Sequence, residues 1–318
     1  ISWLMCTHHG SQLDKDAILS TNGLVNGAGL SVQTWSDPGE AVVLFTPVYH
    51  AFARVIRAAG REVRECPLAI RDGRYEMDFD AWDGLMQGNE RIAILCSPHN
   101  PGGRVWTEAE LRGVGAFCAR HGLILVSDEV HHDLVMPGRR HVPAAVALPD
   151  HAERLVMMSA TTKTFNIAGA HVGNVIIHDP ALRRAFSRTA TATGTSANAF
   201  GLHMATAAYS AEGAAWVDAL MRYIDGNRRL FDAAMAAIPG IRSMPLEATY
   251  LAWVDFAGTG MAPMEFIDRV QTGARIAANH GATFGKGGES FLRFNLATPR
   301  ARVAEAAERL QAAFSDLQ

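Results

Sequence analysis

Three polar side chains follow within four residues of the ends of three successive apolar runs, and each run predicts a buried strand. The side chains are an amide, a carboxylate and an amine: Asn100, Asp128 and Lys163. In an open α/β sheet, ligands bind beyond the carboxyl ends of the strands. We therefore expect these three side chains to face one site.

This set of groups is the one that pyridoxal 5′-phosphate (PLP) requires. Its aldehyde needs a lysine amine, and its ring nitrogen keeps a proton when a buried carboxylate lies opposite. The amide of Asn100 would donate a hydrogen bond to the phenolic oxygen. The residues predict PLP as the cofactor, with Lys163 as its covalent attachment point, and no metal.

The phosphate of such a cofactor needs backbone N–H groups at the start of a helix, together with hydroxyl groups. Gly23, Leu24 and Val25 open a helix-like run that reaches Trp35, and they form the predicted cradle. Thr162 would add a hydroxyl from the lysine loop.

Each of these residues also has an ordinary structural interpretation. Lysines after strands are mostly solvated charges, Asp128 could cap a helix, and Asn100 could form a turn. His131 and His132 could be surface residues or metal ligands, although adjacent side chains diverge on a helix or strand. The joint occurrence of the three groups at consecutive strand ends favours the functional interpretation.

The order of elements predicts the fold class, an α/β protein with a mainly parallel sheet in a three-layer α/β/α large domain. The predicted strands are residues 41–46, 62–66, 92–97, 123–127, 155–159 and 174–177. The helices between them are predicted at residues 49–59, 78–86 and 107–121. Thr107 and Glu110 form a capping box at the start of the last one.

The pattern changes after about residue 197, which predicts a smaller α+β C-terminal domain. We place the large domain at residues 1–222 and the small one at residues 223–318. The elements predicted there are a helical region at 196–238 that is interrupted near Gly226, strands at 250–256 and 291–297, and a final helix with Thr298 as N-cap and Pro299 in its first turn.

Composition excludes several classes of protein. The chain has 318 residues, 48% of them hydrophobic and 19% charged, and a formal net charge of −3. No basic run predicts nucleic-acid binding, and no apolar run approaches the roughly 20 residues that cross a bilayer. The four cysteines have no metal or disulfide spacing, so we expect a protein of the cytoplasm.

Four segments resemble class I/II aminotransferase-fold proteins of PLP fold type I. Among these the chain is most similar to the bacterial cystathionine β-lyase (C–S lyase) branch. The segments are 97–103 (SPHNPGG), 127–131 (SDEVH), 162–169 (TKTFNIAG) and 291–300 (FLRFNLATPR). Supporting matches are TPVY at 46–49, NAFG at 198–201, TYLAW at 249–253 and FGKGG at 284–288.

The resemblance implies the same roles for Lys163, Asp128 and Asn100, implies that Lys163 is also the catalytic base, and adds three residues. Tyr49 matches the ring that stacks on the cofactor, although it could equally be a core tyrosine. Arg293 matches the arginine that binds the substrate carboxylate, a task suited to guanidinium. His131 stands where aminotransferases commonly have tyrosine, and histidine there is typical of the lyase branch.

The sequence departs from the family at the phosphate site and at its start. His171 replaces an arginine eight residues after the lysine, and Ala160 replaces a hydroxyl three residues before it. The family also has an N-terminal segment ahead of the position of Ile1, which supplies substrate-side residues and a tyrosine for the neighbouring subunit. We therefore expect the chain to begin inside a domain.

The resemblance implies α,β-elimination of a cysteine thioether to a thiol, pyruvate and ammonia. Cystathionine, cysteine and cysteine S-conjugates all remain open as small-molecule substrates. An aminotransferase is the alternative, and a PLP-binding regulatory or catalytically impaired protein is a third possibility. The family also implies a homodimer.

Overall fold

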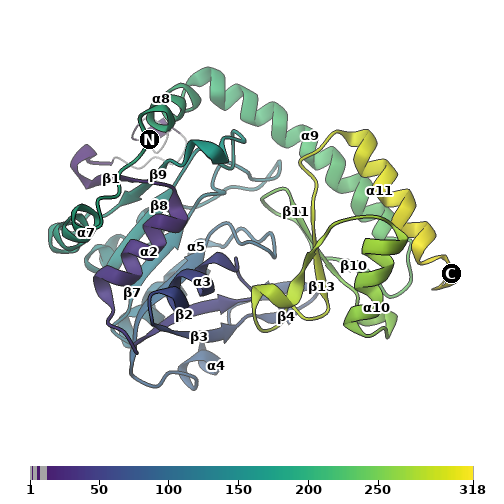
Figure 1. The fold of residues 1–318 in the computed structure, drawn as a ribbon, viewed down its shortest axis with the longest axis horizontal. Coiled ribbons are helices and arrows are strands. Elements are labelled where there is room, and N and C mark those ends of the chain that lie inside the picture. The colour runs from purple at the N-terminus through teal and green to yellow at the C-terminus, as the bar shows by residue number, and fades with distance from the viewer. Residues whose placement is uncertain (1, 3–5, 8–12, 318) are drawn as a thin grey trace.

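The computed structural model describes residue 2, residues 6–7 and residues 13–317. Two sheets organise this part of the chain, and Figure 1 shows the larger one between layers of helices and the smaller one near the C-terminus. The mainly parallel α/β architecture predicted from the sequence is confirmed.

The large sheet has seven strands, and five adjacent ones, β8, β7, β6, β2 and β3, run parallel to one another. Strand β9 pairs antiparallel with both of its neighbours. In spatial order the strands are β1 (Ile18–Thr21), β9 (Gly173–Ile176), β8 (Leu155–Ser159), β7 (Ile124–Asp128), β6 (Glu90–Cys96), β2 (Ala41–Thr46) and β3 (Glu62–Pro67). The six strands predicted in this region are all present, within two residues at each end.

Side chains along the central strands alternate between two cores, because successive residues of a strand point to opposite faces. Val43 and Leu125 pack with helices α4 (Phe79–Asp83), α5 (Glu108–Arg120) and α6 (Ala144–Ala147). Val42 and Val126 pack with α2 (Leu24–Trp35), α3 (Ala51–Ala58) and α7 (Pro180–Ala192). The sheet is therefore covered on both faces, as the long apolar runs predict.

The second sheet is antiparallel and packs against two long helices in a separate hydrophobic core. Its strands in spatial order are β10 (Arg242–Ser243), β11 (Leu251–Asp255), β13 (Phe291–Asn295) and β12 (Asn279–His280). The helices are α9 (Ala211–Ala236) and α11 (Arg300–Ala313), with α10 (Pro263–Asp268) beside them. The predicted boundary between residues 222 and 223 falls inside α9, and it stays a prediction.

The predicted interruption near Gly226 is wrong. Helix α9 continues through this residue, and the break lies earlier, between α8 (Ala199–Ala208) and Ser210, which caps α9 by accepting the Gly213 N–H (3.1 Å). A Cβ at Gly226 would lie 2.4 Å from Arg300 Nη2. The glycine therefore makes room for an arginine of the neighbouring helix.

Two further details differ from the prediction or were missed. Pro299 itself is the N-cap of α11, in place of Thr298, because the helix starts one residue later than predicted. A hairpin of β4 (Ala69–Arg71) and β5 (Arg74–Glu76) was not predicted, because its strands have only three residues each. The capping box of Thr107 and Glu110 is confirmed.

Short helical turns complete the chain between these elements. They are η1 (Lys15–Ala17), η2 (Pro149–Arg154), η3 (Ala168–Ala170), η4 (Ala257–Thr259), η5 (Arg269–Gly273), η6 (Gly281–Phe284) and η7 (Ser315–Leu317). None of the helices within the described residues combines the length and apolar character that a membrane crossing requires.

Candidate active site

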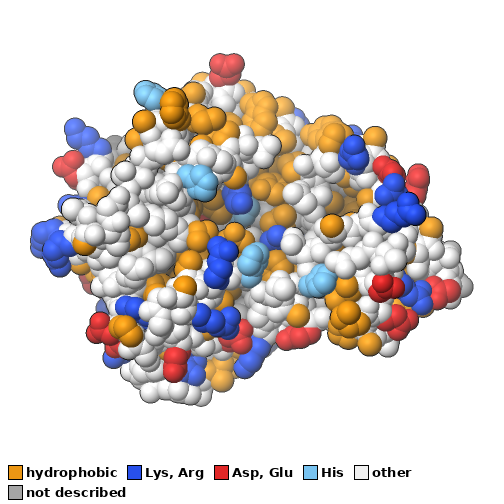
Figure 2. All heavy atoms as spheres, viewed as in Figure 1, with side chains coloured by type: hydrophobic (Ala, Val, Ile, Leu, Met, Phe, Trp, Pro, Cys, Tyr) orange, Lys and Arg blue, Asp and Glu red, His pale blue; other side chains and the backbone are white. Residues whose placement is uncertain are grey.

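A cavity of about 990 Å³ opens at the carboxyl ends of the central strands, next to the small sheet. All ten residues singled out from the sequence line it: Gly23, Leu24, Val25, Tyr49, Asn100, Asp128, His131, Thr162, Lys163 and Arg293. Figure 2 shows Lys, Arg and His side chains around the hollow at the centre of this face. Basic groups in this number suit an anionic ligand.

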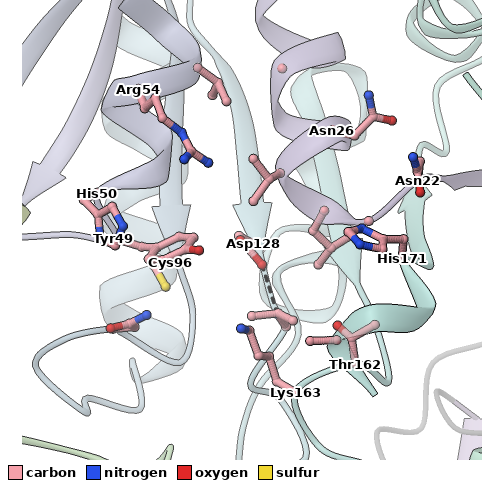
Figure 3. A pocket seen from close by; sticks show the side chains of 18 of the residues that line it. Asn22, Asn26, Tyr49, His50, Arg54, Cys96, Asp128, Thr162, Lys163 and His171 are labelled. Carbon is pink, nitrogen blue, oxygen red and sulfur yellow. Dashed lines mark hydrogen bonds between the residues drawn. The ribbon is translucent and has the colours of Figure 1, made fainter. Parts of the chain in front are cut away.

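Asp128 is the last residue of β7, and only 5% of its surface is exposed. Its Oδ1 accepts the Val130 N–H (3.1 Å), as the dashed line in Figure 3 shows. Burial, together with the nearby Glu129 carboxylate, raises the pKa of Asp128 to about 6, against the opposing influence of the Val130 N–H and Lys163. A cation placed against this carboxylate would lower that pKa again and keep the side chain ionised.

We expect Asp128→Asn to stabilise the cofactor-free protein at pH 8. An unfolded aspartate titrates near 3.9, so the native state holds the proton longer and loses stability as the pH rises from about 4 to about 6. At about 1.4 kcal/mol per pKa unit, the variant should gain roughly 3 kcal/mol at pH 8 and less at pH 5. Urea unfolding at both pH values measures this gain, and an equal effect at both would contradict the buried-charge interpretation.

Lys163 lies in the turn that follows β8, and Figure 3 shows its amine beside Asp128 in the same space. The adjacent Thr164 fixes this turn, because its hydroxyl donates to Asp133 Oδ2 (3.1 Å) in the segment after β7. The N–H groups of Phe165 and Ile167 donate to the carbonyls of residues 161 and 162 (both 3.0 Å). The lysine is thus carried by a hydrogen-bonded loop rather than by a mobile surface segment.

Asn100 and Arg293 connect the two sheets directly. Arg293 Nη1 donates to Asn100 Oδ1 (2.8 Å), and Nη2 donates to Asn279 Oδ1 (2.8 Å). Because guanidinium has no acceptor, the amide oxygen of Asn100 must face Arg293, which turns its NH₂ group toward other partners. The buried Nε of Arg293 has no hydrogen-bond partner within the part of the chain that the structure describes. Donors therefore remain for a ligand carboxylate.

Aromatic rings and a neutral imidazole form the rest of the wall. Burial, helped by Lys163 and Arg293, lowers the pKa of His131 to about 3, so its ring is uncharged at neutral pH. It lies edge-on to Tyr250, with ring centroids 6.0 Å apart. Burial also raises the pKa of Tyr49, so this phenol stays protonated.

The first turn of α2 faces the cavity with unsatisfied backbone donors. Gly23 is its N-cap at φ +85°, no side chain caps the helix, and nothing lies within 4 Å of where a Cβ would be. Gly173 on β9 allows this close approach, since a Cβ there would lie 2.9 Å from the Gly23 carbonyl carbon. Thr162 and His171 line the same end, whereas Ala160 is buried and offers no hydroxyl.

The cavity also contains residues to which the sequence had assigned no role. Tyr250 belongs to a quoted motif, and His50 and Arg54 follow Tyr49 by one and five positions. Figure 3 shows Arg54 reaching toward the cavity from α3. Thr193 and Thr195 lie in the connection between α7 and α8, where no sequence signal pointed to a site.

These features fit PLP. The cavity offers a lysine amine, a buried carboxylate, an oriented amide and an uncapped helix start, which are the four partners that the cofactor's functional groups need. Arg293 lies on the side of the small sheet, and its Nε is a donor that could serve an anionic group. The arrangement defines an α/β enzyme site for amino-acid chemistry.

Comparison with known proteins places the chain in one family. The model of the aminotransferase class I and II family matches residues 1–310, so the chain belongs to this family. The chain is 35% identical over 314 residues to "Cystathionine beta-lyase PatB" of Bacillus subtilis (98% of this chain, 81% of that protein). It is 30% identical to "Protein MalY" of Escherichia coli (93% of this chain, 76% of that protein).

Solved structures agree with this assignment. Cystalysin from Treponema denticola, described as containing PLP, superposes with a TM-score of 0.94 at 34% identity, covering 99% of this chain and 80% of that one. The PLP-bound C–S lyase from Staphylococcus hominis gives a TM-score of 0.90 at 28% identity, covering 99% and 82%. The PLP fold-type I architecture and the resemblance to C–S lyases are thus confirmed.

Proposed function

We propose that this chain is a PLP-dependent carbon–sulfur β-lyase that splits cystathionine, cysteine or a cysteine S-conjugate by α,β-elimination. One water molecule is consumed as the nitrogen is released, and the products are pyruvate, ammonia and a thiol, which is hydrogen sulfide when cysteine is the substrate. The observation that carries the proposal is that Lys163, Asp128, Asn100 and Arg293 line one cavity. The lyases among the similar proteins support the reaction type.

The residues that hold the cofactor follow from the geometry of the cavity. PLP, when bound, supplies an electron sink for the electron pair that a departing Cα proton leaves behind. Asp128 would hold the proton on the ring nitrogen, and Asn100 would donate its amide N–H to the phenolic oxygen. Tyr49 would pack against the ring face. Gly23, Leu24 and Val25 would offer backbone N–H groups to the phosphate, and Thr162 would add its hydroxyl.

The remaining residues bind the substrate and move its protons. Arg293 binds the substrate carboxylate, which orients the Cα proton toward Lys163. The Lys163 amine takes that proton, and the bond from Cβ to sulfur then breaks with the electron pair leaving on sulfur. The uncharged ring of His131 lines this side without adding a second cation that would compete for the carboxylate.

The test is pyruvate release from L-cystathionine and from S-methylcysteine without any added keto acid. A lyase gives steady release under these conditions. An aminotransferase needs a keto acid to turn over repeatedly, and it would give at most one equivalent of product. Transamination that runs about tenfold faster than elimination would replace our proposal, and binding of PLP without either reaction would indicate a regulatory protein.

Arg293→Lys should weaken substrate use by roughly 10- to 100-fold in kcat/KM, mostly through KM. Lysine keeps the charge but loses the fork that binds a carboxylate through two hydrogen bonds. Arg300→Lys is the matched control, because Arg300 belongs to the same part of the chain but bonds to Asn227 and lies over Tyr223. Steady-state kinetics of both variants measure the effect, and equal KM values for the two variants would contradict the role of Arg293 in binding the substrate carboxylate.

We also propose that the protein is a cytoplasmic homodimer that binds no nucleic acid and no membrane. Its four cysteines are free thiols in the structure, which suits a reducing compartment. Two-fold dimers are the commonest soluble oligomers. Light scattering over a dilution series tests the dimer, and a monomer at every concentration would contradict it.

A further inference from the structure

Glu247 is a buried carboxylate that lies outside the cavity and has no part in the chemistry described above. Its side chain is 5% exposed and contacts three arginines: Arg104 Nε (3.1 Å), Arg74 Nη2 (3.1 Å) and Arg139 Nη2 (3.4 Å). The Val105 N–H donates to the same carboxylate (2.9 Å). A buried charge persists only where it is paired and hydrogen-bonded to this extent.

The first set of these partners belongs to the loop that carries Asn100. Arg104 and Val105 follow Asn100 by four and five positions. The carbonyl of Gly103 accepts the N–H groups of Glu247 and Ala248 (both 2.9 Å). Glu247 is therefore joined to the Asn100 loop through both its side chain and its backbone.

The second set belongs to the segment that follows His131. The Met136 N–H donates to the Glu247 carbonyl (3.0 Å), and the Thr249 N–H donates to the Leu134 carbonyl (2.6 Å). Tyr250, the next residue, lines the cavity against the ring of His131. The same short segment thus sets where the Tyr250 ring stands.

The chain then enters the small sheet. Strand β11 starts at Leu251 and pairs with β13, in which Arg293 lies opposite Trp253. The Arg293 side chain donates a hydrogen bond to Asn100, which links the small sheet to the Asn100 loop. Glu247 therefore joins at one point the loop of Asn100, the segment of His131 and the strand that places Arg293.

We propose that Glu247 is a positioning residue for the substrate-carboxylate side of the site. It holds Tyr250 and Arg293 in register with Asn100 and His131. Asp128 instead ends β7, which the large sheet fixes, and Lys163 lies in the turn after β8, which the hydrogen bond from Thr164 to Asp133 holds. The kinetic test of this inference rests on the proposed function, whereas the ligand-binding test does not.

The central variant is Glu247→Gln in the PLP-loaded protein. Glutamine keeps the shape and can still accept the Val105 N–H, but it loses the charge that holds the arginines. We expect KM for the thioether to rise about tenfold or more while kcat stays within about twofold, because misplacement of a binding group acts mainly on substrate capture. PLP affinity, from an absorbance titration of the cofactor-free protein, should stay unchanged.

A second measurement separates this inference from the proposed reaction. The ligand 3-(methylthio)propionate has the carboxylate and thioether but no amine, so its binding by calorimetry requires no turnover. We expect Glu247→Gln to weaken this binding by the same factor as KM. If the wild-type protein releases no pyruvate, the proposed function fails, and the calorimetric comparison still tests Glu247.

Two variants on the β4–β5 hairpin cover the case in which Glu247→Gln does not fold. Arg74→Ala removes one partner of Glu247, whereas Arg71→Ala removes an arginine whose ion pairs, among the residues that the structure describes, are with Glu76 and Asp78. We expect weaker binding of 3-(methylthio)propionate with Arg74→Ala and wild-type binding with Arg71→Ala. Identical binding in these two variants, or a folded Glu247→Gln protein with wild-type KM, would overturn the proposal. A uniform loss of kcat and PLP affinity at unchanged KM would also overturn it.

Discussion

Lys163→Ala is expected to reduce pyruvate release by roughly four orders of magnitude, the upper range for the loss of a positioned proton-transfer group. The amine of Lys163 lies in the cavity beside Asp128, and under the proposed function it takes the Cα proton of the bound amino acid. The other two lysines of the chain, Lys15 and Lys286, are exposed. A continuous assay for pyruvate with a cysteine thioether measures the effect.

Lys286→Ala is the control for this variant, because it removes an exposed amine of the same kind. It should keep wild-type activity. A small primary amine added to Lys163→Ala should restore part of the lost rate, since it can take over the proton transfer from solution. Activity of Lys163→Ala within about tenfold of wild type would show that another group is the base.

Asp128→Asn is expected to lower the elimination rate by several orders of magnitude while PLP still attaches to the protein. The ionised carboxylate keeps the ring nitrogen of the cofactor protonated, and asparagine has the same shape without the charge. Without that proton, the electron pair from the broken Cα–H bond loses most of its stabilisation. Single-turnover measurements with saturating PLP isolate this loss from weaker cofactor binding.

The same variant should gain stability in the absence of PLP, as argued for the buried carboxylate. A loss of activity together with a gain of stability distinguishes a functional carboxylate from a structural cap. Asp128→Asn protein that unfolds more easily at pH 8 would support the structural interpretation. Near wild-type elimination in the variant would show that Asp128 is not the partner of the ring nitrogen.

The central strands and the groups at their ends could be predicted from the sequence for one physical reason. A parallel sheet covered on both faces needs continuous apolar strands, and the polar residues within a few positions after each strand lie at the ligand-binding edge. Asn100, Asp128 and Lys163 were found by this rule. Arg293 and Tyr49 were found only through resemblance to a family, because Arg293 lies within β13 and Tyr49, although it follows β2 by three positions, is an aromatic residue that could equally belong to the core.

What the sequence could not predict depends on contacts between distant parts of the chain. Glu247 accepts hydrogen bonds from Arg104 and Arg74, which are 143 and 173 positions away in the sequence, and no local sequence pattern predicts contacts at such separations. Gly226 looked like a helix break, because the arginine packed against it comes from another helix. Tyr250 had no assigned role until the fold placed its ring beside His131.

The attachment site of the cofactor tests the account most directly. Protein loaded with PLP is reduced with borohydride, which fixes the cofactor on the amine that carries it, and the digested peptides are analysed by mass spectrometry. The account predicts one label per chain, on the peptide that contains Lys163, and its loss when excess substrate is added before reduction. A label on Lys15 or Lys286, or no label on any of the three lysines, would contradict it.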